Sequence, residues 1–150
     1  MNKIKKIFIC CTEQSGENIV FNICKKIKKY NYQIDGVCGK LSETYFTNKY
    51  YDISIFKSLG LVEILISIPK FLKIIYHLRN IILINKYDLV ICVDSPDFNY
   101  QLVKKLRNKS YKNNIIQIVA PTVWAWRKSR AKKFARIYNE IFTLFNFEKK

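Results

Sequence analysis

The sequence is poor in the residues on which several common kinds of site depend. It has one histidine, His77, which excludes a cluster of histidine metal ligands and argues against a histidine-based catalytic triad. Its five cysteines form no C-x-x-C pair and lie mostly in apolar runs, so we expect reduced, buried thiols in a cytosolic protein. The motif G-x-G-x-x-G is absent, which excludes dinucleotide binding in its usual form.

Linker residues and long apolar runs are also missing. The chain of 150 residues has only 4 glycines and 3 prolines and no linker rich in them, so we expect one domain. No uninterrupted apolar run reaches the roughly 18 residues that a membrane-spanning helix needs, and no signal-peptide cleavage site follows the first apolar run. A hydrophobic fraction of 49% excludes intrinsic disorder, so a packed core is expected.

Negative charge is scarce. The chain has 27 lysines and arginines against 11 acidic residues, a net charge of +16. This excess favours a phosphate-bearing partner, either nucleic acid, a nucleotide or an anionic membrane surface. The abundance of Lys, Ile, Asn, Tyr and Phe is also typical of an AT-rich genome, which explains part of the charge without any function.

Short apolar runs alternate with helical periodicity along the chain. Strands are predicted at 4–11, 33–38, 87–93, 114–119 and 141–145. Helices are predicted after the first strand, over 58–86 as two helices that meet near Pro69, after Pro96 and over 126–138, while 41–54 is irregular with one short strand. This order predicts an α/β fold with an open, Rossmann-like parallel sheet and helices on both faces. No helix follows the last strand, so we expect part of the sheet to be uncovered and the chain to be truncated.

Ligands of such sheets bind beyond the carboxyl ends of the strands, where three segments carry polar residues. In the first, Glu13 and Ser15 stand at a helix start, which suits a polar or anionic ligand. The alternative is that Ser15 caps the helix and Glu17 complements its dipole.

The second segment holds two carboxylates around a proline. Asp94 ends a buried strand and can act as a general base, whereas Asp97 is placed to cap the next helix. Ser95 is expected to be extended because it precedes Pro96.

The third segment sets Trp124 and Trp126 beside Arg127 and further basic residues. This pattern suits nucleic acid, a sugar phosphate or a membrane surface, and equally a core tryptophan beside solvated lysines. The basic amphipathic stretch 70–86 either lies on a membrane or covers the sheet.

Together the three segments resemble the lipid-A-disaccharide synthases, glycosyltransferases with two Rossmann-like domains (the GT-B fold). The family's motifs, approximately G-E-x-S-G-D, I-D-A-P-D-F-N and S-P-S-V-W-A-W-R, correspond here to T-E-Q-S-G-E, V-D-S-P-D-F-N and A-P-T-V-W-A-W-R at 12–17, 93–99 and 120–127. Segments 60–65 and 145–149 resemble the family's M-G-x-V-E-V-L and L-P-F-E-K. Thr12 and Glu17 depart from the first motif, where a glycine would let backbone approach a ligand closely.

The resemblance implies a fold, a reaction and partners. Residues 1–150 would form the amino-terminal, acceptor-side domain, and the second, UDP-sugar-binding domain would be absent or separately encoded. The reaction would transfer diacylglucosamine from UDP-2,3-diacylglucosamine to the 6-hydroxyl of 2,3-diacylglucosamine 1-phosphate, with inversion and without cofactor or metal. The chain alone is expected to be inactive because the donor half is missing. The alternatives are a non-catalytic remnant of a split or decaying gene and a basic nucleic-acid-binding module.

The resemblance also assigns roles to residues. Asp94 would be the catalytic base, and the protein would lie in the cytoplasm, peripheral on the anionic inner-membrane surface, with no nucleic acid bound. The residues that would bind substrate are Glu13, Ser15, Gly16, Asp97, Asn99, Trp124 and Arg127, with Trp124 and Arg127 near the acceptor phosphate. The residues that would face the membrane are Lys70, Lys73 and Arg79.

Overall fold

A computed structural model describes residues 5–57, 61–119 and 128–143. Within these ranges, the side chains of residues 61–67 and 128–131 are not described. The strands are β1 (Lys5–Cys11), β2 (Tyr32–Cys38), β3 (Asn48–Asp52), β4 (Leu89–Val93), β5 (Asn114–Ile118) and β6 (Glu140–Phe142). The helices are α1 (Gln14–Ile27), α2 (Leu61–Asn85), α3 (Pro96–Arg107) and α4 (Lys128–Ala135), with 3-10 turns η1 (Glu43–Tyr45) and η2 (Ile53–Phe56).

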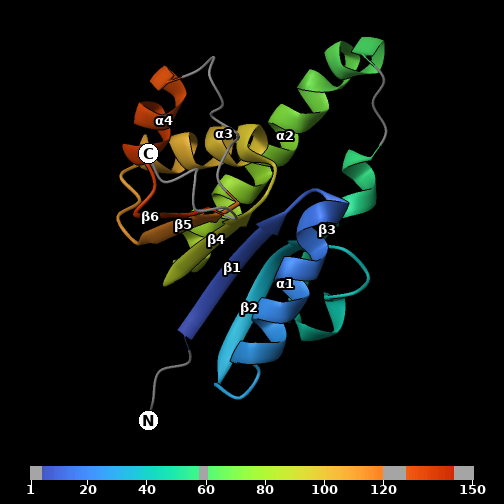
Figure 1. Cartoon of the computed structure of the whole chain (residues 1–150), viewed down its shortest axis with the longest axis vertical. Coiled ribbons are helices and arrows are strands. Elements are labelled where there is room, and N and C mark those ends of the chain that lie inside the picture. Colours follow the sequence, from blue (N-terminus) through green and yellow to red (C-terminus); the bar gives the residue numbers. More distant parts are fainter. Residues whose placement is uncertain (1–4, 58–60, 120–127, 144–150) are drawn as a thin grey trace.

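The six strands form one sheet in the order β3-β2-β1-β4-β5-β6, and every neighbouring pair is parallel. This is the strand order of a doubly wound Rossmann sheet, in which the order reverses between the first and fourth strands. The predicted fold class is therefore confirmed. In Figure 1 the long α2 reaches well past the carboxyl ends of the strands.

Alternate side chains of each strand build two cores. Phe8 and Cys10 point to the face covered by α2 and α3, where they join one buried cluster. Ile7 and Ile9 point to the opposite face and pack with α1. Helices thus cover both faces, as predicted, although at the β6 edge Phe142 remains 48% exposed among the described residues.

Two local predictions were wrong. The stretch 58–86 holds one helix, α2, which runs through Pro69 instead of two helices that meet there. A proline removes one backbone hydrogen bond, and the buried face that follows it, including Ile74 and Leu78, holds α2 on the sheet. The last helix, α4, is also shorter than the predicted 126–138.

The cysteines behave as small apolar residues, as predicted. All five are free and buried, and burial raises the pKa of the Cys11, Cys24 and Cys38 thiols to about 12. Among the described helices, none combines the length and apolar character that crossing a membrane requires.

Candidate functional site

The carboxyl ends of β1 and β4 bring the first two polar segments together. Cys11 pairs with Val93 in the sheet, so the residues after them, Thr12 and Asp94, emerge side by side. The Thr12 hydroxyl donates a buried hydrogen bond of 2.6 Å to the Ser95 hydroxyl, and the Ser15 hydroxyl donates to Oδ2 of Asp94. Two segments about 80 residues apart in sequence therefore form one polar edge at the point where the strand order reverses.

The backbone at this edge is strained. Asp94 and Ser95 have φ values of 55° and 42°, and Val119 at the end of β5 has φ 69°, so three non-glycine residues occupy the left-handed region. The expectation that Ser95 is extended was wrong, because proline disfavours the right-handed helical region before it but leaves this conformation accessible. Such strain persists only where surrounding contacts enforce it, and it is typical of functional sites.

Buried amides supply those contacts. The Asp94 carbonyl accepts hydrogen bonds from Asn99 Nδ2 at 2.8 Å and from Gln117 Nε2 at 3.0 Å, while the Asp94 amide donates to the Ile118 carbonyl. Both amide side chains are fully buried, and their own oxygens have no partner among the described residues. Asn99 and Gln117 therefore hold the Asp94 turn in position from the buried side. Gln117 was not predicted as part of the site, although a glutamine inside the apolar strand N-I-I-Q-I was a visible signal.

The Asp94 carboxylate is half-buried and oriented by two donors. Its Oδ1 accepts from the Ser95 backbone amide at 3.0 Å, and its Oδ2 accepts from the Ser15 hydroxyl. One carboxylate oxygen is thus held by backbone and the other faces an O–H donor. This arrangement suits a carboxylate that accepts a proton from a hydroxyl group.

Gly16 explains how α1 comes so close to Asp94. A Cβ atom on this buried glycine would lie 2.8 Å from the Cys11 sulfur and 3.2 Å from the Asp94 Cβ. Only glycine allows this approach without displacing a neighbour. Gly16 therefore lets the first turn of α1 present Ser15 to Asp94.

The capping role suggested as an alternative for Ser15 is wrong, whereas Glu17 does lie in the first turn of α1, as its suggested dipole role requires. The position before α1 is Glu13, which makes no capping bond through its side chain, and Ser15 lies inside the helix. Glu17 lies in the first turn but is 1% exposed, and its two carboxylate oxygens accept from the backbone amides of Gly39 and Ser42 at 2.8 and 2.9 Å. The carboxylate of Glu17 thus joins α1 to the loop after β2.

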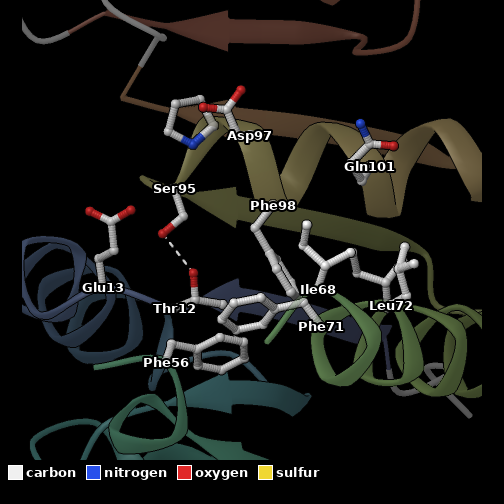
Figure 2. Close-up of a pocket in the computed structure, with 12 residues that line it drawn as sticks. Thr12, Glu13, Phe56, Ile68, Phe71, Leu72, Ser95, Asp97, Phe98 and Gln101 are labelled. Atoms are coloured by element: carbon white, nitrogen blue, oxygen red, sulfur yellow. Dashed lines mark hydrogen bonds between the residues drawn. The ribbon is translucent and has the colours of Figure 1, made fainter. Parts of the chain in front are cut away.

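A pocket of about 770 Å³ opens beside the polar edge. Figure 2 shows the Thr12 and Ser95 pair, Glu13 and Asp97 toward one side and a group of apolar side chains toward the other. The apolar lining comes from η2, α2 and α3 and consists of Phe56, Ile68, Phe71, Leu72, Ile75 and Phe98. Phe98 is half-buried, because its ring lines this pocket.

The remaining predicted residues fall into separate places. Asp97 is the second residue of α3 and lines the pocket, whereas the cap position belongs to Ser95, so the capping role suggested for Asp97 was wrong. Trp124 and Arg127 lie outside the described residues. No group of three or more His, Cys, Asp or Glu side chains in the described ranges is placed to hold a metal ion.

The three candidate membrane residues on α2 do not share one surface. Lys70 and Lys73 line a second hollow of about 680 Å³ together with His77 and Tyr51, whose hydroxyl lies 2.6 Å from the histidine Nδ1. Arg79 instead stacks on the ring of Tyr76, at 4.8 Å from the ring centre. The structure therefore groups the two lysines and separates them from Arg79.

Comparison with a solved structure supports the fold. A protein described as a UDP-N-acetylglucosamine 2-epimerase from Listeria monocytogenes superimposes on 94% of this chain and 39% of its own, with a TM-score of 0.60. At 11% identity, this likeness concerns the fold alone.

Sequence comparisons are more specific. The family model for lipid-A-disaccharide synthetase matches residues 7–150. Lipid-A-disaccharide synthases from Rickettsia canadensis, Rickettsia bellii and Pseudoalteromonas translucida are 38%, 34% and 34% identical over 95%, 97% and 99% of this chain. These alignments cover 38%, 39% and 40% of the relatives, so the chain spans about two fifths of their length. The chain therefore belongs to the lipid-A-disaccharide synthetase family.

Proposed function

We propose that this chain is the acceptor-side domain of an inverting glycosyltransferase. The reaction transfers 2,3-diacylglucosamine from its UDP donor to the 6-hydroxyl of 2,3-diacylglucosamine 1-phosphate. Family membership supports the reaction class. The geometry of Asp94 supports the assignment of this chain to the acceptor side. The observation that carries the proposal is a half-buried carboxylate, fixed on a strained turn at the reversal of strand order, with one oxygen bonded to a hydroxyl.

The proposed step moves one proton to Asp94 and one glycosyl group to the acceptor oxygen. Asp94 Oδ2 accepts the proton of the acceptor 6-hydroxyl, whose oxygen forms a bond to the anomeric carbon of the donor sugar. The bond from that carbon to the UDP oxygen breaks, and UDP leaves with the electron pair. In the structure the Ser15 hydroxyl donates to the same oxygen, Oδ2, and thereby marks the direction from which an acceptor hydroxyl can approach.

A chimera tests this assignment. The chain is fused to the remaining three fifths of the Rickettsia canadensis relative, and turnover of the UDP donor is measured. Asp94→Asn is expected to lower turnover by roughly 10²–10⁴ with acceptor binding almost unchanged, because asparagine keeps the shape but cannot take up the proton.

Asp97→Asn is the matched control in that chimera. Its position in the first turn of α3 predicts only a small change in turnover. The reversed order, with Asp97→Asn inactive and Asp94→Asn active, would remove Asp94 as the base but leave the site at this edge. Turnover by residues 1–150 alone would contradict the proposal that a second domain must hold the donor.

We also propose that the protein binds anionic membranes peripherally through α2. The second hollow presents Lys70 and Lys73 without any carboxylate in its lining. Basic groups near anionic headgroups support this orientation. We propose that this surface is the cytoplasmic face of the inner membrane, which would also hold the lipid substrates of the proposed reaction.

Vesicle flotation tests the membrane proposal. Replacing Lys70 and Lys73 together by glutamine is expected to weaken binding to anionic vesicles roughly 30-fold, from about 1 kcal/mol per lysine. The control is the same change at Lys132 and Lys133, which are exposed on α4. Salt of about 0.5 M is expected to release the wild-type chain, because screening weakens headgroup contacts. Retention at high salt, or equal losses in both variants, would contradict this surface.

A further inference from the structure

The apolar end of the pocket beside Asp94 has a preformed wall. Phe56 from η2, Phe71 from α2 and Phe98 from α3 pack on one another, with ring centres 5.2–6.4 Å apart. Phe56 and Phe71 are nearly parallel, and Phe98 stands edge-on to both. Because three elements fix these rings, the wall exists without a ligand.

Next to the phenylalanine wall, the pocket lining includes apolar side chains that are exposed to solvent. Ile68 and Leu72 are 44% and 40% exposed, lie one helical turn apart on α2 and continue the lining of the pocket. Singly exposed apolar residues are common, but an apolar patch continuous with a hollow indicates a binding site. Figure 2 shows both side chains beside the phenylalanine group.

The opposite end of the pocket has the polarity of a sugar site. Thr12 and Ser95 contribute hydroxyls there, and Glu13 and Asp97 are the charged residues in the lining. Both charges are negative, so this end suits hydroxyl groups that donate hydrogen bonds and disfavours a phosphate. Gln101 also lines the pocket, toward the apolar side chains in Figure 2. The pocket therefore runs from a hydroxyl-binding end to an end that is aromatic and aliphatic apart from this amide.

We propose that the apolar end binds one acyl chain of the acceptor, with the sugar of that lipid at the Thr12 and Ser95 end and its phosphate directed away from the pocket. This inference rests on the proposed function, because it assumes that the acceptor hydroxyl meets Asp94. A ligand with a neutral sugar at one end and an alkyl chain at the other matches both ends of the pocket. The acyl chain then anchors the acceptor beside the base.

Alkyl glucosides of increasing chain length are suitable probes, used as monomers with the complete 150-residue chain. Affinity, measured by calorimetry, is expected to rise about fourfold per methylene until the pocket is filled. Methyl resonances of Ile68, Leu72 and Ile75 are expected to shift on binding. A wild-type chain whose affinity does not depend on chain length would overturn the proposal.

Two variants and one control locate the chain. Leu72→Trp fills the pocket and Leu72→Gln removes apolar contact without added bulk, and each is expected to lower the affinity for the longest probe at least tenfold. Ile84→Trp alters a residue that is 77% exposed on the same helix but outside the pocket, and is expected to bind as wild type. Equal losses in all three variants would indicate surface adsorption and overturn the proposal, as would self-association through Leu72 without glucoside binding.

Failure of this proposal and failure of the proposed function are distinguishable. Asp94→Asn is expected to leave the dependence of glucoside affinity on chain length unchanged, because the alkyl chain does not contact that carboxylate. If the dependence holds and the Asp94→Asn chimera remains active, the base assignment is wrong and the acyl pocket stands. If the chimera loses turnover and the dependence is absent, the base assignment stands and the acyl pocket is wrong.

Discussion

Glu17 and Asp94 lie at the same edge of the sheet but differ in what surrounds them. Glu17 is 1% exposed and uses both oxygens to bind backbone amides in the loop after β2. Asp94 is half-buried, sits on a left-handed turn, and gives one oxygen to a backbone amide and the other to a serine hydroxyl. A carboxylate saturated by backbone stabilises the fold, whereas one that faces a hydroxyl can exchange that partner for a substrate.

The largest expected difference in stability is between Glu17→Gln and Asp94→Asn. Glutamine at position 17 keeps one acceptor and turns an amide toward a buried backbone N–H, which is expected to cost about 2–3 kcal/mol. Asparagine at position 94 can still accept from Ser95 and donate to Ser15, so a loss below about 1 kcal/mol is expected. Urea unfolding of the 150-residue chain measures both. Equal losses would erase the distinction between the two carboxylates.

Gly16→Ala tests the close approach that joins the two loops. The added Cβ meets the Cys11 sulfur at 2.8 Å and presses on Asp94, so we expect a loss of about 1–3 kcal/mol. Asn18→Ala, an exposed change on the same helix, is the control and is expected to be slightly stabilising, because alanine favours helix more than asparagine does. Thermal unfolding compares them, and a Gly16→Ala chain as stable as wild type would show that α1 can shift without disturbing Asp94.

Thr12→Val probes the buried hydroxyl pair at the polar end of the pocket. Valine keeps the shape but cannot donate to the Ser95 hydroxyl, so we expect a loss of about 1 kcal/mol. Thr44→Val, at an exposed position, is the control. Unfolding in denaturant provides the measurement. No change at Thr12 would mean that the Ser95 turn is held by Asn99 and Gln117 alone.

The smallest effect is expected for a half-buried ion pair away from the site. Lys49 lies between Asp52 and Glu43, and its hydrogen bond to Asp52 holds the pKa of that carboxyl well below its usual range. A lowered pKa stabilises the folded chain above the ordinary value of about 4, and that stability is lost as pH falls below it. Asp52→Asn is expected to cost at most about 1 kcal/mol at pH 7 and nothing in strong acid.

Stability measured against pH checks this last prediction. Glu140→Gln, an exposed change on β6, is the control, and its difference from wild type is expected to stay near zero across the same range. A difference for Asp52→Asn that grows as pH falls would contradict the sign of the effect.

Much of the fold was predictable because its signals are local. Apolar runs placed the strands, and their alternation with helical stripes gave the parallel Rossmann-like class. The predicted helix break at Pro69 was wrong because local propensity favours a break there, whereas the packing of α2 on the sheet overrides that propensity. The hydrogen-bond partners of Glu17 could not be predicted for a related reason, since they lie in a loop more than 20 residues away.

The sequence by itself determined the alternation of strands and helices, the polar segments at the strand ends and, through its motifs, the family. Only the tertiary structure decided which polar residues meet. Ser15 and Asp94, or Thr12 and Ser95, are distant in sequence and become neighbours because β1 and β4 pair in register. The pocket likewise depends on three elements that pack their phenylalanines together, and such packing follows from long-range contacts that no local pattern encodes.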